Sequence, residues 1–169
     1  MKRALLLLIP ALIALSACSS CPTKADSDVD DKNWIQEVAA ADIDLLVGRL
    51  QKEGLKTGWY KAGSVAWLMY GELPLKVGLN IERRLMSLRV FACFRHKAEI
   101  EPNVDLLLGV NNTNRDGYVK VYLDSEADIC SESFYSYRRG IDVKAFKGFI
   151  THFQEATISA VKPFESYLM

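Results

Sequence analysis

The chain is poor in the residues that most often carry chemistry. Its 169 residues include two histidines, His96 and His152, and four cysteines. The sequence contains no His-Glu-x-x-His zinc pattern, no Gly-x-Ser-x-Gly nucleophile turn and no glycine-rich phosphate loop. These absences predict that the protein is not an enzyme. From the sequence we therefore assign no catalytic residue, no cofactor and no metal ligand.

An excess of charge of one sign is also missing. Lys and Arg total 21, and Asp and Glu total 21. Cleavage of a leader that carries Lys2 and Arg3 would leave 21 minus 2, or 19, basic residues and a net charge of −2. A neutral to slightly acidic domain lacks the positive field that draws proteins to DNA and RNA. We therefore do not expect nucleic acid as a partner.

The apolar run at the start of the chain is too short to cross a bilayer. It extends from Ala4 to Ala14 and follows the basic pair Lys2-Arg3. A spanning helix needs about 20 apolar residues. The run has instead the length and the basic flank of the apolar part of a cleavable signal.

Leu15-Ser16-Ala17-Cys18 comes next. It resembles the lipobox of bacterial lipoproteins, in which leucine and two small residues precede an obligatory cysteine. The resemblance implies a signal peptide over 1–17 and, on Cys18, a lipid with fatty acyl chains such as palmitate. Because Ser19 rather than aspartate follows the cysteine, it also implies anchoring at the periplasmic face of the outer membrane. The alternative is an ordinary secretory signal with a cysteine near its cleavage site, which the spacing and apolar length disfavour.

Residues 18–33 are predicted to be a lipidated, disordered tether. The segment has no apolar period, one proline and four aspartates. A flexible chain of this length has a root-mean-square reach of about 20 Å. We expect residues 34–169 to form one domain that stays near the membrane and stands off it. The aspartates fit a solvated linker better than a cation site.

Apolar periodicity predicts an α+β domain. Asp42 caps a helix that Gly54 ends, and a Phe-rich helix covers 143–167. The predicted order is helix, three strands, helix, two strands, helix. Consecutive antiparallel strands predict a sheet of about five strands with helices on one face. The strands are predicted at 64–70, 76–82, 86–94, 118–123 and 128–137, and Pro102 opens the helix between the third and the fourth.

The second helix has a clear apolar stripe. Val104, Leu107, Leu108 and Asn111 recur at helical spacing, which predicts that they form the buried side of the helix. Asn111 and Asn114 stand near its predicted end. Because asparagine tolerates the left-handed conformation that closes helices, a structural cap is favoured over ligand binding for both.

Three segments carry a family pattern. They are the opening helix that ends in Gly54, the run Val110-Asn111-Asn112-Thr113-Asn114-Arg115, and the run Val119-Lys120-Val121-Tyr122-Leu123-Asp124. Together they resemble the YbjN-like family, whose fold is similar to that of type III secretion chaperones, over 41–167. This chain has Thr113 where the family usually has an aromatic residue. The family has no agreed catalytic residues, and the resemblance implies a small module that binds protein segments or dimerises.

Two cysteines remain for the domain. Cys18 is assigned to the lipid and Cys21 to the tether, which leaves Cys93 and Cys130. The family fold implies that the third and fifth strands are neighbours, so that a Cys93–Cys130 disulfide is geometrically feasible in an oxidising compartment. Two separate thiols are the alternative, because Cys93 alternates with apolar neighbours and would point away from the helix-covered face.

Aromatic residues supply the candidate interaction face. An open sheet face that carries tyrosine and tryptophan is a typical protein-binding surface, since these residues contribute strongly at interfaces. The alternative is that the same residues complete the core or pack against the tether. The candidates are Trp59, Tyr60, Trp67, Tyr70, Tyr135 and Tyr137.

These observations predict a non-catalytic protein-interaction module of the chaperone or adaptor kind. It would be tethered to the membrane through Cys18 and would bind a partner segment or its own copy. The alternative is a periplasmic carrier that holds a small ligand or a lipid between the sheet and the helices. A third hypothesis, a thiol-based enzyme, would depend on Cys93 and Cys130.

Overall fold

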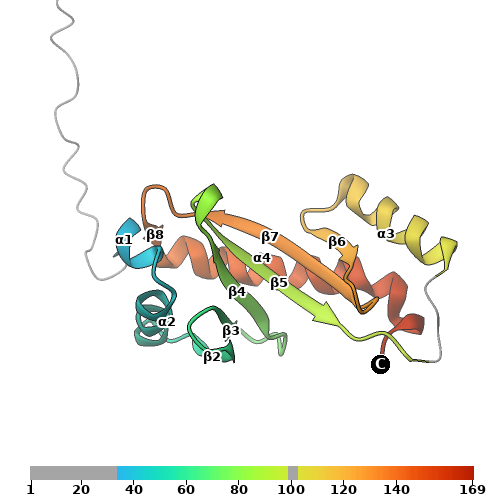
Figure 1. Ribbon diagram of the computed structural model, residues 1–169, viewed down its shortest axis with the longest axis horizontal. Coiled ribbons are helices and arrows are strands. Elements are labelled where there is room, and N and C mark those ends of the chain that lie inside the picture. Colours follow the sequence, from blue (N-terminus) through green and yellow to red (C-terminus); the bar gives the residue numbers. More distant parts are fainter. Residues whose placement is uncertain (1–33, 99–102) are drawn as a thin grey trace, which may run out of the picture.

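The computed structural model describes residues 34–98 and 103–169 (Figure 1). The predicted signal over 1–17 and the predicted tether over 18–33, with Cys18 and Cys21, lie outside the described residues. So does Pro102. The elements are β1 (Trp34–Ile35), α1 (Glu37–Ala40), α2 (Ile43–Lys52), β2 (Lys56–Lys61), β3 (Val65–Met69), β4 (Val77–Glu82), the short 3-10 helix η1 (Arg83–Leu85), β5 (Ser87–Phe94), α3 (Val104–Asp116), β6 (Lys120–Leu123), β7 (Ile129–Ser136), β8 (Ile141–Asp142), α4 (Val143–Val161) and the 3-10 helix η2 (Lys162–Tyr167).

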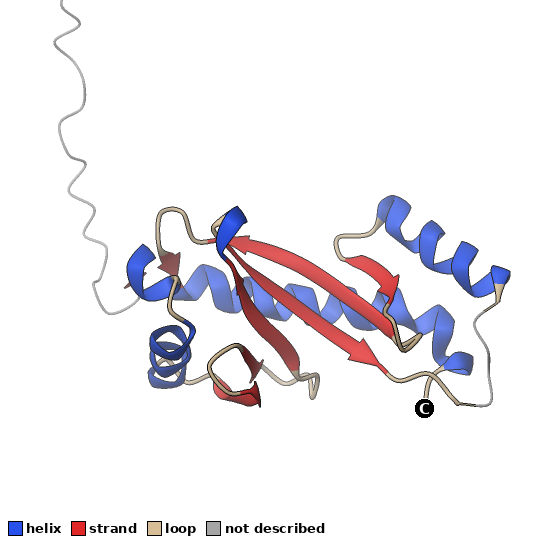
Figure 2. Cartoon of the chain, viewed as in Figure 1, coloured by secondary structure: helices blue, strands red, loops and turns tan. Residues whose placement is uncertain are grey.

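The main sheet has six strands in the order β2-β3-β4-β5-β7-β6, and every neighbouring pair is antiparallel. Helix α4 runs along one face of this sheet, as Figures 1 and 2 show. β1 and β8 form a separate two-stranded ribbon. The predicted α+β class and antiparallel sheet are confirmed. None of the helices in the two described ranges is both long and apolar enough to cross a membrane.

The strand count was predicted too low, because β2 escaped the sequence pattern. Its sequence, Lys-Thr-Gly-Trp-Tyr-Lys, shows no apolar alternation, and none of its residues is buried. β2 is an edge strand, so it pairs with β3 on one side only. An edge strand needs less apolar surface than a central one, and lysine is common there because it discourages pairing with other chains.

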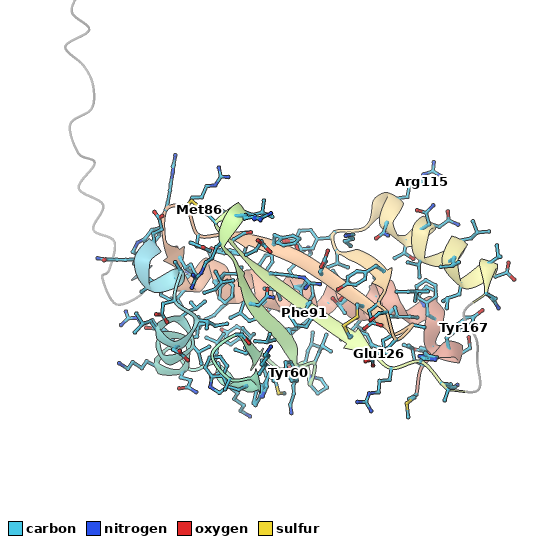
Figure 3. All side chains as sticks on the ribbon, viewed as in Figure 1. Tyr60, Met86, Phe91, Arg115, Glu126 and Tyr167 are labelled. Carbon is cyan, nitrogen blue, oxygen red and sulfur yellow. A yellow bond between two sulfur atoms is a disulfide. The ribbon has the colours of Figure 1, made fainter. Side chains whose placement is uncertain are left out.

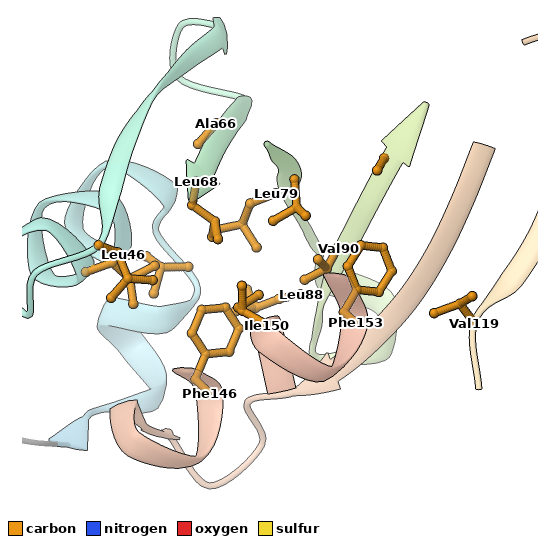
Figure 4. Packing of buried hydrophobic residues seen from close by; sticks show 14 of the residues in the cluster. Leu46, Ala66, Leu68, Leu79, Leu88, Val90, Val119, Phe146, Ile150 and Phe153 are labelled. Atoms are coloured by element: carbon orange, nitrogen blue, oxygen red, sulfur yellow. The ribbon is translucent and has the colours of Figure 1, made fainter. Parts of the chain in front are cut away.

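The core lies between the sheet and α4 (Figure 4). Leu88 and Val90 of β5 alternate with residues of the opposite face, and both are 0 % exposed. From α4, Phe146, Ile150 and Phe153 meet them and are also fully buried. Each such side chain contributes about 1.5–3 kcal/mol on burial. This apolar layer fixes which face of each strand is turned to solvent.

The first predicted helix forms as expected. Asp42 caps α2, since its Oδ1 accepts hydrogen bonds from the backbone N–H of Asp44 and Leu45 at 3.0 and 3.1 Å. Gly54, with φ at +88°, adopts the left-handed conformation that turns the chain away from the helix end. The last predicted helix also forms, as α4 followed by η2.

The predicted orientation of the second helix was wrong. Val104, Leu107 and Leu108 of α3 are 68, 53 and 55 % exposed, and Asn111 is exposed too. Leu106 and Val110, on another side of the helix, are 2 and 7 % exposed. The apolar period was therefore real, but most of its stripe faces solvent in a single chain.

A glycine explains which side of α3 turns inward. A Cβ on Gly109 would lie 2.9 Å from the ring of Phe164 in η2, closer than ordinary packing allows. Helix α3 therefore packs closely against η2 at Gly109, which has no side chain. Phe164 is 4 % exposed beneath it. An apolar pattern that counts only large side chains cannot detect a contact made at a glycine.

Two glycines inside helices give a matched test of this packing. Gly148 of α4 has no atom within 4 Å of an added Cβ. Gly148→Ala should therefore raise the free energy of unfolding by about 1 kcal/mol through helix propensity alone. Gly109→Ala should fail to stabilise, because the new methyl meets Phe164. Urea unfolding of both variants measures this, and equal gains would contradict the close approach of α3 to η2.

Candidate functional site

The face of the sheet opposite α4, here called the open face, is turned toward the viewer in Figure 3. On β5, Arg89, Phe91 and Cys93 alternate with the buried Leu88 and Val90. The register of the sheet places residues of the neighbouring strands beside them on the same face. These are Trp67, Gly78, Lys120, Tyr122, Cys130, Glu132 and Phe134.

Glu132 is the centre of the ionic contacts on this face. It is 7 % exposed, and its Oε2 accepts a hydrogen bond of 2.7 Å from Nε of Arg89. Its Oε1 accepts one of 3.1 Å from Nζ of Lys120. Arg89 also donates to the hydroxyl oxygen of Tyr122 at 2.6 Å. Burial raises the pKa of Tyr122, and the charge of Arg89 opposes that shift.

Two aromatic rings lie close against strand glycines. A Cβ on Gly78 of β4 would overlap the ring of Phe91. A Cβ on Gly58 of β2 would come within 2.6 Å of the ring of Trp67. Glycine in a strand often marks such a close approach. Lys76 extends this layer, with Nζ 4.8 Å from the centroid of the Trp67 ring. Aromatic and cationic side chains therefore cover much of the open face.

Cys93 and Cys130 are joined by a disulfide on this face. They stand opposite each other in the register of β5 and β7, and the S–S distance is 2.06 Å. The two halves differ in their surroundings, since Cys93 is exposed and Cys130 is 1 % exposed. Oδ2 of Asp124 lies 3.7 Å from Sγ of Cys130. The two sulfurs and this carboxylate lie within 4.8 Å of one another, but bonded sulfurs lack the thiolate charge by which cysteine binds metals.

A groove of about 380 Å³ opens beside Cys93. Its lining comes from the β2–β3 hairpin, from the start of β4 and the end of β5, and from the residues next to them; Figure 3 labels two of the lining residues, Tyr60 and Phe91. Its lining combines apolar side chains with three cations and one acid. The lining residues are Tyr60, Lys61, Val65, Lys76, Gly78, Phe91, Ala92, Cys93, Arg95 and Asp128.

The comparisons with known proteins bear on the fold. No protein-family model matches the chain, and no curated protein matches it. Among solved structures, the crystal structure of YbjN from E. coli, described as a proposed transcription regulator, superimposes with a TM-score of 0.57. The similarity covers 77 % of this chain and 97 % of YbjN, at 13 % sequence identity.

The chain has a YbjN-like fold. At this identity the similarity concerns the fold and carries no activity with it. One expectation drawn from the YbjN resemblance is confirmed: the third and fifth predicted strands, β5 and β7, are neighbours. This neighbourhood is what brings Cys93 and Cys130 face to face.

Asn114, which the YbjN resemblance singled out, has a structural role of another kind than a helix cap. Helix α3 continues to Asp116, beyond both asparagines. The Asn114 side chain instead accepts from the backbone N–H of Val121 at 2.6 Å and donates to its carbonyl oxygen at 2.7 Å. It thereby occupies the backbone groups of β6 that a further strand would use. Asn111 is simply exposed on α3.

Most of the predicted aromatic interaction face is not on the open face. Tyr137 is 2 % exposed, and burial raises its pKa. Tyr135 packs edge-on against Phe146 of α4, with ring centroids 5.1 Å apart. Tyr70 is half-buried, with Nζ of Lys147 in α4 5.5 Å from its ring. All three complete the core or flank α4, which was the alternative for them.

Trp67 and Tyr60 are the predicted aromatics that do lie on the open face. Trp67, the register partner of Gly58, is half-buried, and Tyr60 lines the groove. Trp59 is 37 % exposed, but its register partner Ala66 is buried toward the helices. The sequence reasoning missed Phe91 and Tyr122. Strand alternation could have found Phe91, since it stands between Val90 and Ala92, which are both buried on the opposite face.

The ionic centre gives a prediction about stability. In Glu132→Gln a neutral amide would replace the mostly buried carboxylate. Arg89 and Lys120 would then lose the negative charge that they contact. The free energy of unfolding should fall by about 1–3 kcal/mol. Glu126→Gln, at an exposed turn residue, should change it by less than about 0.5 kcal/mol. Urea denaturation of the two variants is the measurement, and equal small effects would show that Glu132 has no stabilising role.

Proposed function

We propose that the protein is a non-catalytic protein-interaction module of the chaperone or adaptor kind, anchored at a membrane by lipid on Cys18. The observation that carries the interaction is the apolar strip of α3, made by Val104, Leu107 and Leu108. All three side chains are more than half exposed. A single exposed leucine is ordinary, but three large apolar residues on one helix side mark a surface that another molecule covers.

The strip has the chemistry of a docking surface for an apolar helix or for a second copy of this chain. Covering one leucine completely is worth about 1.5–3 kcal/mol before the costs of association. Leu107 and Leu108 could therefore anchor a partner. The opposite side of α3 is held by Leu106 and Val110 against the body of the domain. The strip is thus presented on a supported helix.

The comparison supports a binding role without naming the partner. YbjN itself is described as a proposed transcription regulator, a description that specifies no reaction. The resemblance to type III secretion chaperones points in the same direction, since those proteins act by binding. We do not extend the regulator description to DNA binding, because the charge balance of this chain lacks a basic excess.

The proposed location is supported by the sequence alone. A lipid on Cys18 and about 15 following residues would hold the domain within about 20 Å of the bilayer. More than one acyl chain is needed for stable anchoring, which diacylglycerol supplies. We propose the periplasmic face of the outer membrane, because Ser19 follows the cysteine.

The carrier alternative gains no support from the core. Between the sheet and α4, the described side chains Phe146, Ile150 and Phe153 are 0 % exposed and fill the layer where a ligand would have to lie. The hollows described on this protein are open grooves on its surface. Three large apolar side chains of α3 remain more than half exposed, which favours binding at the surface.

The interaction is tested with a photo-reactive amino acid in place of Leu108 in intact cells. We expect a discrete cross-linked product, identified by mass spectrometry as this chain or one defined partner. Leu107→Glu should abolish the product, because a buried unpaired carboxylate is costly at an apolar interface. The same photo-reactive residue at Leu45 of α2, which is 58 % exposed, is the matched control.

A monomeric protein that gives no product from position 108, or the same products from 45 and 108, would contradict the docking role of α3. Leu107→Glu should leave urea unfolding nearly unchanged, since the side chain is exposed in the single chain. This separates loss of binding from loss of folding.

Anchoring is tested by Cys18→Ser. The wild-type protein should enter the membrane fraction and incorporate a labelled palmitate analogue, whereas the variant should do neither. Cys21→Ser is the control and should behave as wild type. A wild-type chain found free of membranes with an unmodified Cys18 would overturn the anchoring proposal and leave the α3 proposal to be judged separately.

A further inference from the structure

The disulfide and the groove are next to each other on the open face. Cys93 is one of the residues that line the groove. Tyr60, Val65 and Phe91 supply its apolar walls. A small molecule in the groove would therefore lie against Cys93, the exposed half of the disulfide.

The charges around the groove favour an anion. Lys61, Lys76 and Arg95 are exposed and all belong to the lining. Asp128 is the one acid among the lining residues, and its Oδ1 accepts a hydrogen bond of 3.1 Å from the backbone N–H of His96. Three cations against one engaged carboxylate attract negatively charged ligands.

The two sulfurs are unequal targets for a thiolate. Cys93 is exposed and next to the cations, whereas Cys130 is 1 % exposed with Oδ2 of Asp124 3.7 Å from its sulfur. An incoming thiolate has access to Cys93, whereas burial shields Cys130. Asp124 lies within 4.8 Å of both sulfurs and does not distinguish them. The same carboxylate disfavours a lasting negative charge on Cys130 once the bond is broken. Once released, Cys130 is therefore held as a neutral thiol, while the same carboxylate slows its departure.

We propose that Cys93–Cys130 is a reversible thiol-exchange site, and that the groove binds a small anionic thiol which attacks the sulfur of Cys93. This site is independent of any partner on α3.

The exchange balances in two steps. In the first, the thiolate of the bound ligand attacks Sγ of Cys93, the Cys93–Cys130 bond breaks, and Cys130 leaves with the electron pair and takes the proton that the ligand thiol lost. In the second, another ligand thiolate attacks the ligand sulfur of the mixed disulfide and releases Cys93. Two ligand thiols become one disulfide, and the protein gains two thiols. The reverse sequence oxidises the protein again.

The first experiment uses the wild-type whole chain in detergent, with glutathione as the anionic probe. The protein is equilibrated in buffers of varied reduced to oxidised glutathione, quenched with acid, alkylated and mapped by mass spectrometry. We expect Cys93 and Cys130 to pass from bonded to free within the range, while circular dichroism stays that of the folded protein. A bond that stays closed at every ratio, or a fold that is lost on reduction, would overturn the proposal in favour of a purely structural cross-link.

The second experiment tests the groove. All proteins carry Cys21→Ser, and the initial rate of mixed-disulfide formation is measured with glutathione and with the cationic thiol cysteamine. The double variant Lys61→Glu/Lys76→Glu should lower the ratio of the glutathione rate to the cysteamine rate about tenfold. Lys144→Glu, at an exposed position on α4, should leave the ratio unchanged.

Peptide mapping of the trapped adduct completes the test. We expect glutathione on Cys93. An adduct on Cys130 would contradict attack at Cys93. A rate ratio that the groove variant does not alter would contradict anion binding in the groove. Because the ratio compares two thiols on the same protein, a general change in the folding of a variant does not imitate the expected result.

Discussion

The packing of α4 on one face of the sheet is the constraint on which the rest of the structure depends. Phe146 and Phe153 bury the inner side of β5 completely, so the two faces of this strand cannot exchange. A shift of the strand by one residue would place Arg89 in the core and Leu88 in solvent. This apolar layer therefore fixes the position of the open face, of its ionic centre and of its disulfide.

The same constraint separates what was predictable from what was not. Alternation in β4 and β5 follows from burial on one side, so these strands and the antiparallel α+β class could be predicted from the sequence. β2 could not, because an edge strand with lysine at both ends has no apolar period to detect. Single-strand patterns also leave the pairing order open. The YbjN resemblance supplied the β5–β7 neighbourhood, and with it the meeting of Cys93 and Cys130.

Side-chain environments were harder to predict than elements. The stripe on α3 was recognised, but the sequence does not say whether another part of the same chain covers it. The contact of Gly109 with Phe164 joins residues of two elements far apart in the chain, and no local pattern indicates it. For the same reason Tyr135 and Tyr137 were placed on a binding face, whereas Tyr135 packs against Phe146 of α4 and Tyr137 is buried.

The side chain of Asn114 has a consequence for how this sheet ends. By bonding both backbone groups of Val121, it imitates a neighbouring strand one residue long. Free edges are where sheets of different molecules join and grow into fibrils. At β6 a single amide takes up the backbone groups of Val121 in the middle of the edge, whereas β2, the other edge of the main sheet, has lysines at both ends of the strand.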